Sequence, residues 1–205
     1  MSEKFTTIEQ RASYGIGLQM GQQLGQNPFD GFDIDAALAG IQTAFNRAPS
    51  EVSNEDMQAA FQEISQRIQA AKAEQSKAVI EEGEKFLADN AAREGVFVTE
   101  SGLQYEIITE GNGDKPVASS TVRTHYHGTL IDGTVFDSSY QRNQPAEFPV
   151  GGVIKGWTEA LQMMPVGSKW RLYVPYNLAY GEQGAGSAIG PYTTLIFDVE
   201  LLDIL

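Results

Sequence analysis

Val153-Ile154-Lys155-Gly156-Trp157 joins an apolar pair, a glycine and a tryptophan, and residues 158–164 extend this stretch as far as Pro165. The pattern predicts one or two turns of amphipathic helix between runs that resemble strands on both sides. A helix this short is marginal in water unless other side chains pack over it. We therefore expect the second half of the chain to be a sheet folded around this helix, with Trp157 as the floor of a pocket.

Charge and composition exclude several kinds of partner and site. The 205 residues carry a net charge of −13, spread over both halves of the chain, and contain no cysteine. An acidic surface repels phosphate backbones and anionic membranes, so we expect neither nucleic acid nor a membrane as a partner. The absence of cysteine excludes disulfides and thiol chemistry and is compatible with a reducing compartment.

The amino terminus lacks the basic start and apolar run of a secretory signal, and no window is apolar enough to span a membrane. We therefore expect a cytoplasmic location.

The composition changes near Gly95. Before this glycine the chain is rich in Ala, Gln and Glu with helical spacing, and after it come β-branched residues, aromatics, glycine and proline. We expect a helical dimerisation domain over 1–52, a long linking helix over 53–95 whose start packs into that domain, and a sheet domain over 96–205.

The first helix is expected to begin at Thr6, with Glu9 completing a capping box. Gly17, Gly21 and Gly25 then recur at every fourth residue. Each glycine costs about 1 kcal/mol in a helix relative to alanine, which close contact with another helix could offset. The alternative is that the helix frays and ends by Gly21.

Two further helices are marked by their caps. Asp33 is expected to cap the second, and Ser53 with Asp56 the third, which we expect to run to Glu94 before Gly95. The front of the chain has too little large apolar surface for a core of its own. We therefore predict a homodimer formed through the N-terminal helices, with the long helices as arms; the alternative is a monomeric three-helix bundle.

Residues 96–205 show strand periodicity. We expect strands over 103–108, 121–130, 135–138, 147–150, 169–174 and 194–204, and a glycine-rich loop over 176–192. Strands dominate and one helix interrupts them, so the fold class is α+β, with an antiparallel sheet wrapped around one short helix.

The sequence contains few of the side chains that usually act in catalysis. His125 and His127 share one face of a strand and could hold a metal only with help from carboxylates, so we interpret them as surface histidines and expect neither metal nor cofactor. The glycine-rich segment 181–186 follows no βα unit and predicts a flap rather than a phosphate loop.

Aromatic and aliphatic side chains, by contrast, gather at strand ends and in loops, and Asp137 is the carboxylate that we expect to face an apolar wall. These apolar residues are Tyr126, Phe136, Phe148, Val153, Ile154, Trp157, Tyr180, Ile189 and Phe197.

Six motifs, in order over about 100 residues, resemble the macrolide-binding (FKBP-type) peptidyl-prolyl cis–trans isomerases. They are His125-Tyr126-His127-Gly128, Asp132 to Ser139, Val153 to Trp157, Met164-Pro165-Val166-Gly167, Leu178-Ala179-Tyr180-Gly181 and Thr194 to Leu202. The front half, with Ser13-Tyr14-Gly15-Ile16-Gly17 and the long helix, resembles the dimerisation domain of the bacterial macrophage-infectivity-potentiator (Mip) subgroup. That resemblance implies a V-shaped dimer with catalytic domains at the arm tips.

The residues suit the chemistry of that family. Rotation about a prolyl peptide bond faces a barrier of ~18–20 kcal/mol from amide resonance, and no bond is broken. Twisting makes the amide less dipolar, so an apolar pocket shaped for the twisted form lowers the barrier. A chain with few acid–base groups and many aromatics is what such a reaction requires.

The resemblance also implies roles for single residues. Trp157 would be the floor under the proline ring, while the Ile154 N–H and the Tyr180 hydroxyl would hold substrate carbonyls. Asp137 would lie near the twisting carbonyl, with Arg142 orienting it. The pocket would be completed by Tyr126, Phe136, Phe148, Val153, Ile189 and Phe197, although Phe148 and Phe197 could instead be core residues alone.

The chain departs from well-studied family members at Ala146, Ala185 and Gly190, where those members carry an aromatic residue, a histidine and a proline. The loop wall should therefore be lower and looser, which affects substrate preference and macrolide affinity.

The resemblance implies as partners partly folded proline-containing proteins and macrolide inhibitors of the rapamycin type. Two other functions stay open: a holdase that grips apolar segments without turnover, and a metal-dependent enzyme.

Overall fold

The computed structural model describes residues 4–26 and 28–205, and its contacts divide the chain into two compact units, 1–72 and 73–205. The division falls inside the long helix rather than at either of its ends. The bounds expected from composition, 1–52, 53–95 and 96–205, remain our proposal for the domains.

The first unit contains α1 (Ile8–Gln26), α2 (Ile34–Phe45) and the first part of α3 (Asn54–Ala91). The cap of α1 lies one residue later than expected: Thr7 Oγ1 accepts from the Gln10 N–H, and Gln10 Oε1 accepts from the Thr6 N–H at 2.9 Å. The helix continues through Gly21 and Gly25, so the alternative that it frays and ends by Gly21 is wrong. A Cβ atom on either glycine would meet nothing within 4 Å, so neither is a close-contact point within this chain.

The other caps are confirmed. Asp33 Oδ1 accepts from the N–H groups of residues 35 and 36, and Ser53 Oγ accepts from the Asp56 N–H at 3.0 Å. The end expected for α3 at Glu94 is three residues too late. A tight turn, in which the Arg93 N–H donates to the Asn90 carbonyl, leads directly into the first strand.

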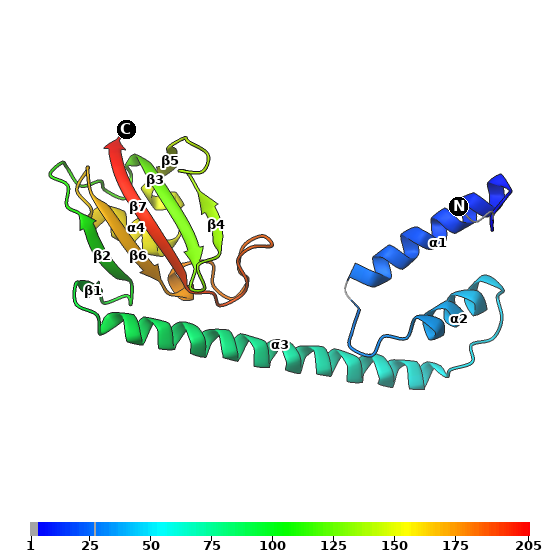
Figure 1. The fold of residues 1–205 in the computed structure, drawn as a ribbon. Coiled ribbons are helices and arrows are strands. Elements are labelled where there is room, and N and C mark those ends of the chain that lie inside the picture. The colour runs from blue at the N-terminus through cyan, green and yellow to red at the C-terminus, as the bar shows by residue number, and fades with distance from the viewer. Residues whose placement is uncertain (1–3, 27) are drawn as a thin grey trace. The chain divides into compact units, whose positions relative to one another are not determined.

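The second unit contains the rest of α3 and a seven-stranded antiparallel sheet with one short helix (Figure 1). The strand order is β1-β2-β6-β7-β3-β4, and β5 also pairs with β3. The strands are β1 (Val96–Val98), β2 (Gln104–Thr109), β3 (Thr121–Leu130), β4 (Val135–Ser138), β5 (Ala146–Pro149), β6 (Lys169–Val174) and β7 (Leu195–Ile204). The α+β class and its antiparallel sheet are therefore confirmed, and β1 is a strand that the sequence pattern did not predict.

The core lies between the inner face of the sheet and α4 (Lys155–Met163). Trp157 is only 4% exposed, and Leu161 is fully buried. Gly156 permits this packing, since a Cβ atom there would meet Val174 Cγ1 at 2.6 Å. Two short 3₁₀ turns, Val150–Gly152 and Tyr176–Leu178, carry the chain into α4 and away from β6.

The last turns of α3 pack on the outer face of the same sheet. Gly83 lies against Thr194, whose Oγ1 would be 2.7 Å from an added Cβ atom, so Gly83 serves close packing and does not interrupt α3. Gln104 is almost fully buried beneath the helix and donates to the Leu87 carbonyl while accepting from Asn90, both at 2.8 Å. Residues 83–93 therefore belong structurally with the sheet.

Within the described residues, no helix combines the length and the apolar character that a membrane span requires.

Candidate functional site

A cavity of about 290 Å³ opens over the first turn of α4, on the inner side of the sheet. Residues of β3, β4, β5 and β7, the segment that leads into α4, the first turn of α4 and the loop after β6 line this cavity. Its lining residues are Tyr126, Phe136, Asp137, Phe148, Gly152, Val153, Ile154, Trp157, Tyr180 and Phe197.

Trp157 is the centre of the aromatic part of this cavity. The rings of Tyr126, Phe148 and Phe197 all meet its indole edge to face, with centroids 5.3–5.8 Å away. Phe136 in turn meets Phe197 at 5.4 Å. Edge-to-face packing fixes each ring against the next, so the wall has a defined shape.

The polar side of the cavity is built around Asp137. Its carboxylate accepts from the Tyr126 hydroxyl at 2.5 Å and from the Arg142 guanidinium, which also donates to the Tyr126 hydroxyl at 2.7 Å. Burial alone would raise the pKa of Asp137, but the hydrogen bonds from Tyr126 and Arg142 outweigh it and hold the pKa below its usual value. Asp137 is therefore ionised at neutral pH.

Two donors at the cavity lack partners among the described residues. The Tyr180 hydroxyl makes no hydrogen bond there, and its side chain is 41% exposed. Burial, and then the charge of Asp137, raise the pKa of Tyr180, so the hydroxyl stays protonated. The Ile154 N–H precedes the first turn of α4, where backbone donors are commonly left free.

The structure brings together nine of the eleven residues singled out in the sequence. Phe148 and Phe197, for which a place in the core alone was the alternative, both line the cavity. Arg142 contacts Asp137 but lines a neighbouring polar hollow beside Ala146.

Ile189 is not among the lining residues. It is 7% exposed, packs in the core and pairs with Ala185 across the flap. Gly152 lines the cavity but was not predicted, because a turn glycine offers no side-chain pattern to detect.

The two histidines lie on the partly exposed face of β3. His125 Nδ1 is 2.9 Å from Ser139 Oγ, and its ring stacks on Tyr140 at 4.6 Å. Over the described ranges, no three His, Cys, Asp or Glu side chains are grouped so that they could hold a metal ion.

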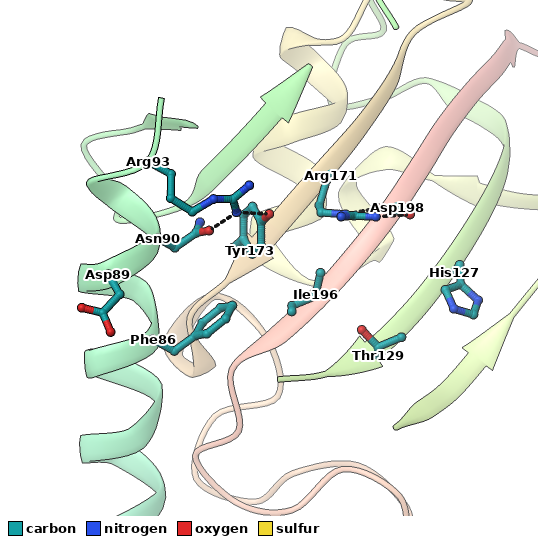
Figure 2. A pocket seen from close by; sticks show the side chains of 10 residues that line it. All are labelled: Phe86, Asp89, Asn90, Arg93, His127, Thr129, Arg171, Tyr173, Ile196 and Asp198. Carbon is teal, nitrogen blue, oxygen red and sulfur yellow. Dashed lines mark hydrogen bonds and ion pairs between the residues drawn. The ribbon is translucent and has the colours of Figure 1, made fainter. Parts of the chain in front are cut away.

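A second, larger cavity of about 500 Å³ lies on the outer face of the sheet, beside the end of α3 (Figure 2). Most of its charged groups are already engaged in ion pairs, and none of its lining residues also lines the aromatic cavity. It is lined by Phe86, Asp89, Asn90, Arg93, His127, Thr129, Arg171, Tyr173, Ile196 and Asp198.

Two family models match the chain. Residues 113–202 match the model described as FKBP-type peptidyl-prolyl cis-trans isomerase, and residues 9–107 match the domain amino terminal to FKBP-type peptidyl-prolyl isomerase. Together they cover both units.

Relatives with similar sequences extend over nearly the whole chain. The FKBP-type 22 kDa peptidyl-prolyl cis-trans isomerase of Escherichia coli (strain K12) is 53% identical over 201 residues, which is 98% of each protein. The Outer membrane protein MIP of Legionella longbeachae is 41% identical over 97% of this chain and 87% of its own length. The crystal structure of FkpA from Escherichia coli matches with a TM-score of 0.73 and 35% identity, over 98% of each chain.

Proposed function

The chain belongs to the family of FKBP-type peptidyl-prolyl cis-trans isomerases and is an enzyme of that class, and we propose that the aromatic cavity over Trp157 is its catalytic site. There, the barrier to rotation about an Xaa-Pro bond falls because the twisted amide fits better than either planar isomer. The reaction forms and breaks no covalent bond, so it requires neither a nucleophile nor a metal.

The cavity suits the twisted state electrostatically. Twisting localises the nitrogen lone pair and reduces the amide dipole, so the planar forms lose more solvation than the twisted form when water is replaced by aromatic walls. The proline ring lies over the indole of Trp157, which is enclosed by the rings of Tyr126, Phe148 and Phe197. The observation that carries this proposal is that wall of edge-to-face rings around an almost fully buried indole.

The polar groups hold the substrate and do not exchange protons with it. The Tyr180 hydroxyl and the Ile154 N–H donate to substrate carbonyls on either side of the twisting bond. Asp137, kept ionised by Tyr126 and Arg142, places a fixed negative charge near the carbonyl carbon as that carbonyl turns. Arg142 is a positioning residue in this scheme.

A peptide isomerisation assay tests the site. The wild type and a variant combining Trp157→Ala with Asp137→Val are compared by magnetisation exchange on a short prolyl peptide, with Tyr180→Phe as a milder variant whose fold is easier to preserve. We expect the double variant to lose at least about 100-fold in kcat/KM, or ~2.7 kcal/mol of transition-state stabilisation.

The competing function is a holdase that grips apolar segments with negligible turnover. A double variant as active as the wild type, while both remain folded, would favour that holdase and remove the proposed site.

We also propose that the chain forms a homodimer through its N-terminal helices. None of the described residues of α1 or α2 is buried. Four large apolar residues on these helices are 53–87% exposed: Ile8, Ile16, Leu38 and Phe45. A cavity of about 540 Å³ lined mainly by small side chains lies between α2 and the start of α3. Apolar surface of this extent on a helical unit indicates association with a second copy.

A dimer with two catalytic cavities would hold one unfolded client at two points and so increase its retention without new chemistry. The V-shaped arrangement and the chaperone-like activity belong to this proposal. Because residues 83–93 pack on the sheet, truncation for this test begins at residue 73 and not near Gly95. The 73–205 fragment should keep peptide activity and lose much of its effect on a proline-limited refolding reaction. Equal refolding rates for the fragment and the full chain would refute the dimer's role.

Binding of macrolide inhibitors of the rapamycin type is part of the same proposal, since such molecules would occupy the aromatic cavity. Ala146, Ala185 and Gly190 leave its loop wall low, so we expect weak affinity, measurable by titration calorimetry.

The cytoplasmic location stays a prediction, to be tested by cell fractionation. One relative carries the name Outer membrane protein MIP.

A further inference from the structure

The outer face of the sheet carries a row of polar side chains, three of which are charged with alternating sign. Glu106, Arg171, Asp198 and His127 are direct cross-strand neighbours on β2, β6, β7 and β3. Arg171 donates from Nε and Nη2 to the two carboxylate oxygens of Asp198, at 2.6 and 2.9 Å. Arg93, from the turn after α3, donates to Glu106 at 2.7 Å. Glu106 and Asp198 thus each have a guanidinium partner, and the charges of these two ion pairs neutralise one another.

The hydrogen-bonding capacity that remains on the floor of this face includes N–H and O–H donors. Asp89 on α3 is the lining carboxylate that makes no hydrogen bond or ion pair among the described residues, and its side chain points away from the sheet (Figure 2). A guanidinium has five N–H groups, and Arg171 uses only its Nε and Nη2 atoms. The Thr129 hydroxyl and the His127 ring make no hydrogen bond within the ranges that the structure describes, and both line the cavity. The oxygens of Glu106 and Asp198 are already occupied by Arg93, Arg171 and the Tyr173 hydroxyl.

Apolar surface lies beside these donors. Ile196 stands next to Thr129 and Tyr173 in the neighbouring cross-strand row, and Phe86 reaches from α3 over this side of the sheet (Figure 2). The helix therefore turns an otherwise open sheet face into a trough, here called the outer groove, with an apolar wall and a floor of donors. All its residues belong to the unit 73–205.

We propose that the outer groove binds an extended, uncharged segment of an unfolded client, with main-chain carbonyls on the donors and one aromatic or branched aliphatic side chain against Phe86 and Ile196. Charge selects this occupant. The floor pairs Arg93 and Arg171 with Glu106 and Asp198, so a charged segment of either sign meets repulsion beside each attraction. The net charge of −13 further disfavours acidic segments.

This proposal rests on the proposed client binding and adds a second contact to it. The outer groove and the aromatic cavity lie on opposite faces of one sheet, so one client could occupy both. A segment without proline would enter only the outer groove, which separates binding there from catalysis.

Methyl NMR of the full chain tests the proposal, because one isoleucine marks each site: Ile196 the outer groove and Ile154 the aromatic cavity. A proline-free, uncharged peptide with a single Phe is titrated into the labelled protein. We expect a saturable shift of the Ile196 resonance and none of Ile154. Thr129→Arg should weaken binding by about tenfold or more while leaving activity on a short prolyl peptide unchanged. Gln75→Arg, an exposed substitution outside the groove with the same charge change, should leave both unchanged.

Several results would overturn the proposal: a shift of Ile154 alone, no saturable shift of Ile196, or equal affinity when the peptide's Phe is replaced by Asp or Lys. An Ile196 shift on concentrating the protein without peptide would identify a second copy as the occupant and would also refute it. Client retention by the dimer is tested separately by the refolding comparison, which can fail while the peptide still binds.

Discussion

Removing the end of α3 should destabilise the catalytic unit without changing its cavity. A fragment of residues 96–205 lacks Asn90, Leu87 and Arg93, whereas a fragment of residues 73–205 retains them. The cut removes four hydrogen bonds to the sheet that involve side chains: Asn90 to Gln104, Gln104 to the Leu87 carbonyl, and Arg93 to Tyr173 and to Glu106. It also uncovers Tyr173, which is 3% exposed in the complete unit.

At about 0.5–1.5 kcal/mol for each hydrogen bond, these contacts stabilise the unit by roughly 2–6 kcal/mol. Part of that gain is lost in ordering the helix end, so we expect a net difference of about 3 kcal/mol. With a urea dependence of about 1–3 kcal/mol/M, the unfolding midpoint should fall by roughly 1–3 M.

Equilibrium urea unfolding of the two fragments, followed by tryptophan fluorescence, measures this difference. Both fragments should isomerise a short prolyl peptide equally well while folded, since none of the removed residues lines the aromatic cavity. A 73–205 fragment carrying Arg93→Met serves as an intermediate case and should lose only part of the stability. Coincident midpoints for the two fragments would show that α3 does not pack on the sheet as described.

Four other predictions concern the charge of Asp137, its contact with Arg142, the packing of α3 and the need for a metal. Because the pKa of Asp137 is depressed, its charge is present at neutral pH and is lost only as pH falls through that lowered pKa, so kcat/KM should stay flat from about pH 8 to about pH 5. Arg142→Leu removes a hydrogen-bond donor that lowers the pKa of Asp137 against the effect of burial. The acid limb of the pH–rate profile should therefore move to higher pH, and an unmoved limb would exclude Arg142 as a positioning residue. Gly83→Ala should lower the urea midpoint, because the new Cβ meets Thr194 Oγ1, and adding Thr194→Ala should recover it; Gly40→Ala, where nothing lies within 4 Å, should not lower stability. Chelators should leave the peptide activity unchanged, and a loss restored by added metal would support the metal-dependent alternative.

The sheet and much of the site were predictable because their signals are local. Alternation over Thr121–Leu130 gives the bounds of β3 correctly, and burial follows that alternation at Val122, Thr124 and Tyr126. The helix over the cavity was expected from the glycine and tryptophan at its start. Positions in the quoted motifs then identified eight of the residues that line the cavity, and Phe148, outside those motifs, is the ninth.

What the sequence left undetermined depends on contacts distant along the chain. Gly83 looks like a weak point in a helix, and only its approach to Thr194 explains it. Asn90 and Gln104 are ordinary surface residue types that become buried because each satisfies the other. Ile189 was expected in the cavity wall, but the flap pairing with Ala185 places it in the core. The outer groove brings together α3 and three strands, so no single stretch of sequence indicates it.

The central claim is that an aromatic cavity over an indole accelerates rotation about a prolyl bond without proton transfer. Magnetisation exchange on a short Xaa-Pro peptide, measured with the wild-type chain in H₂O and in D₂O, tests it most directly. The account predicts strong acceleration with rates nearly equal in the two solvents. A rate no faster than the spontaneous one, or a several-fold decrease in D₂O, would contradict it.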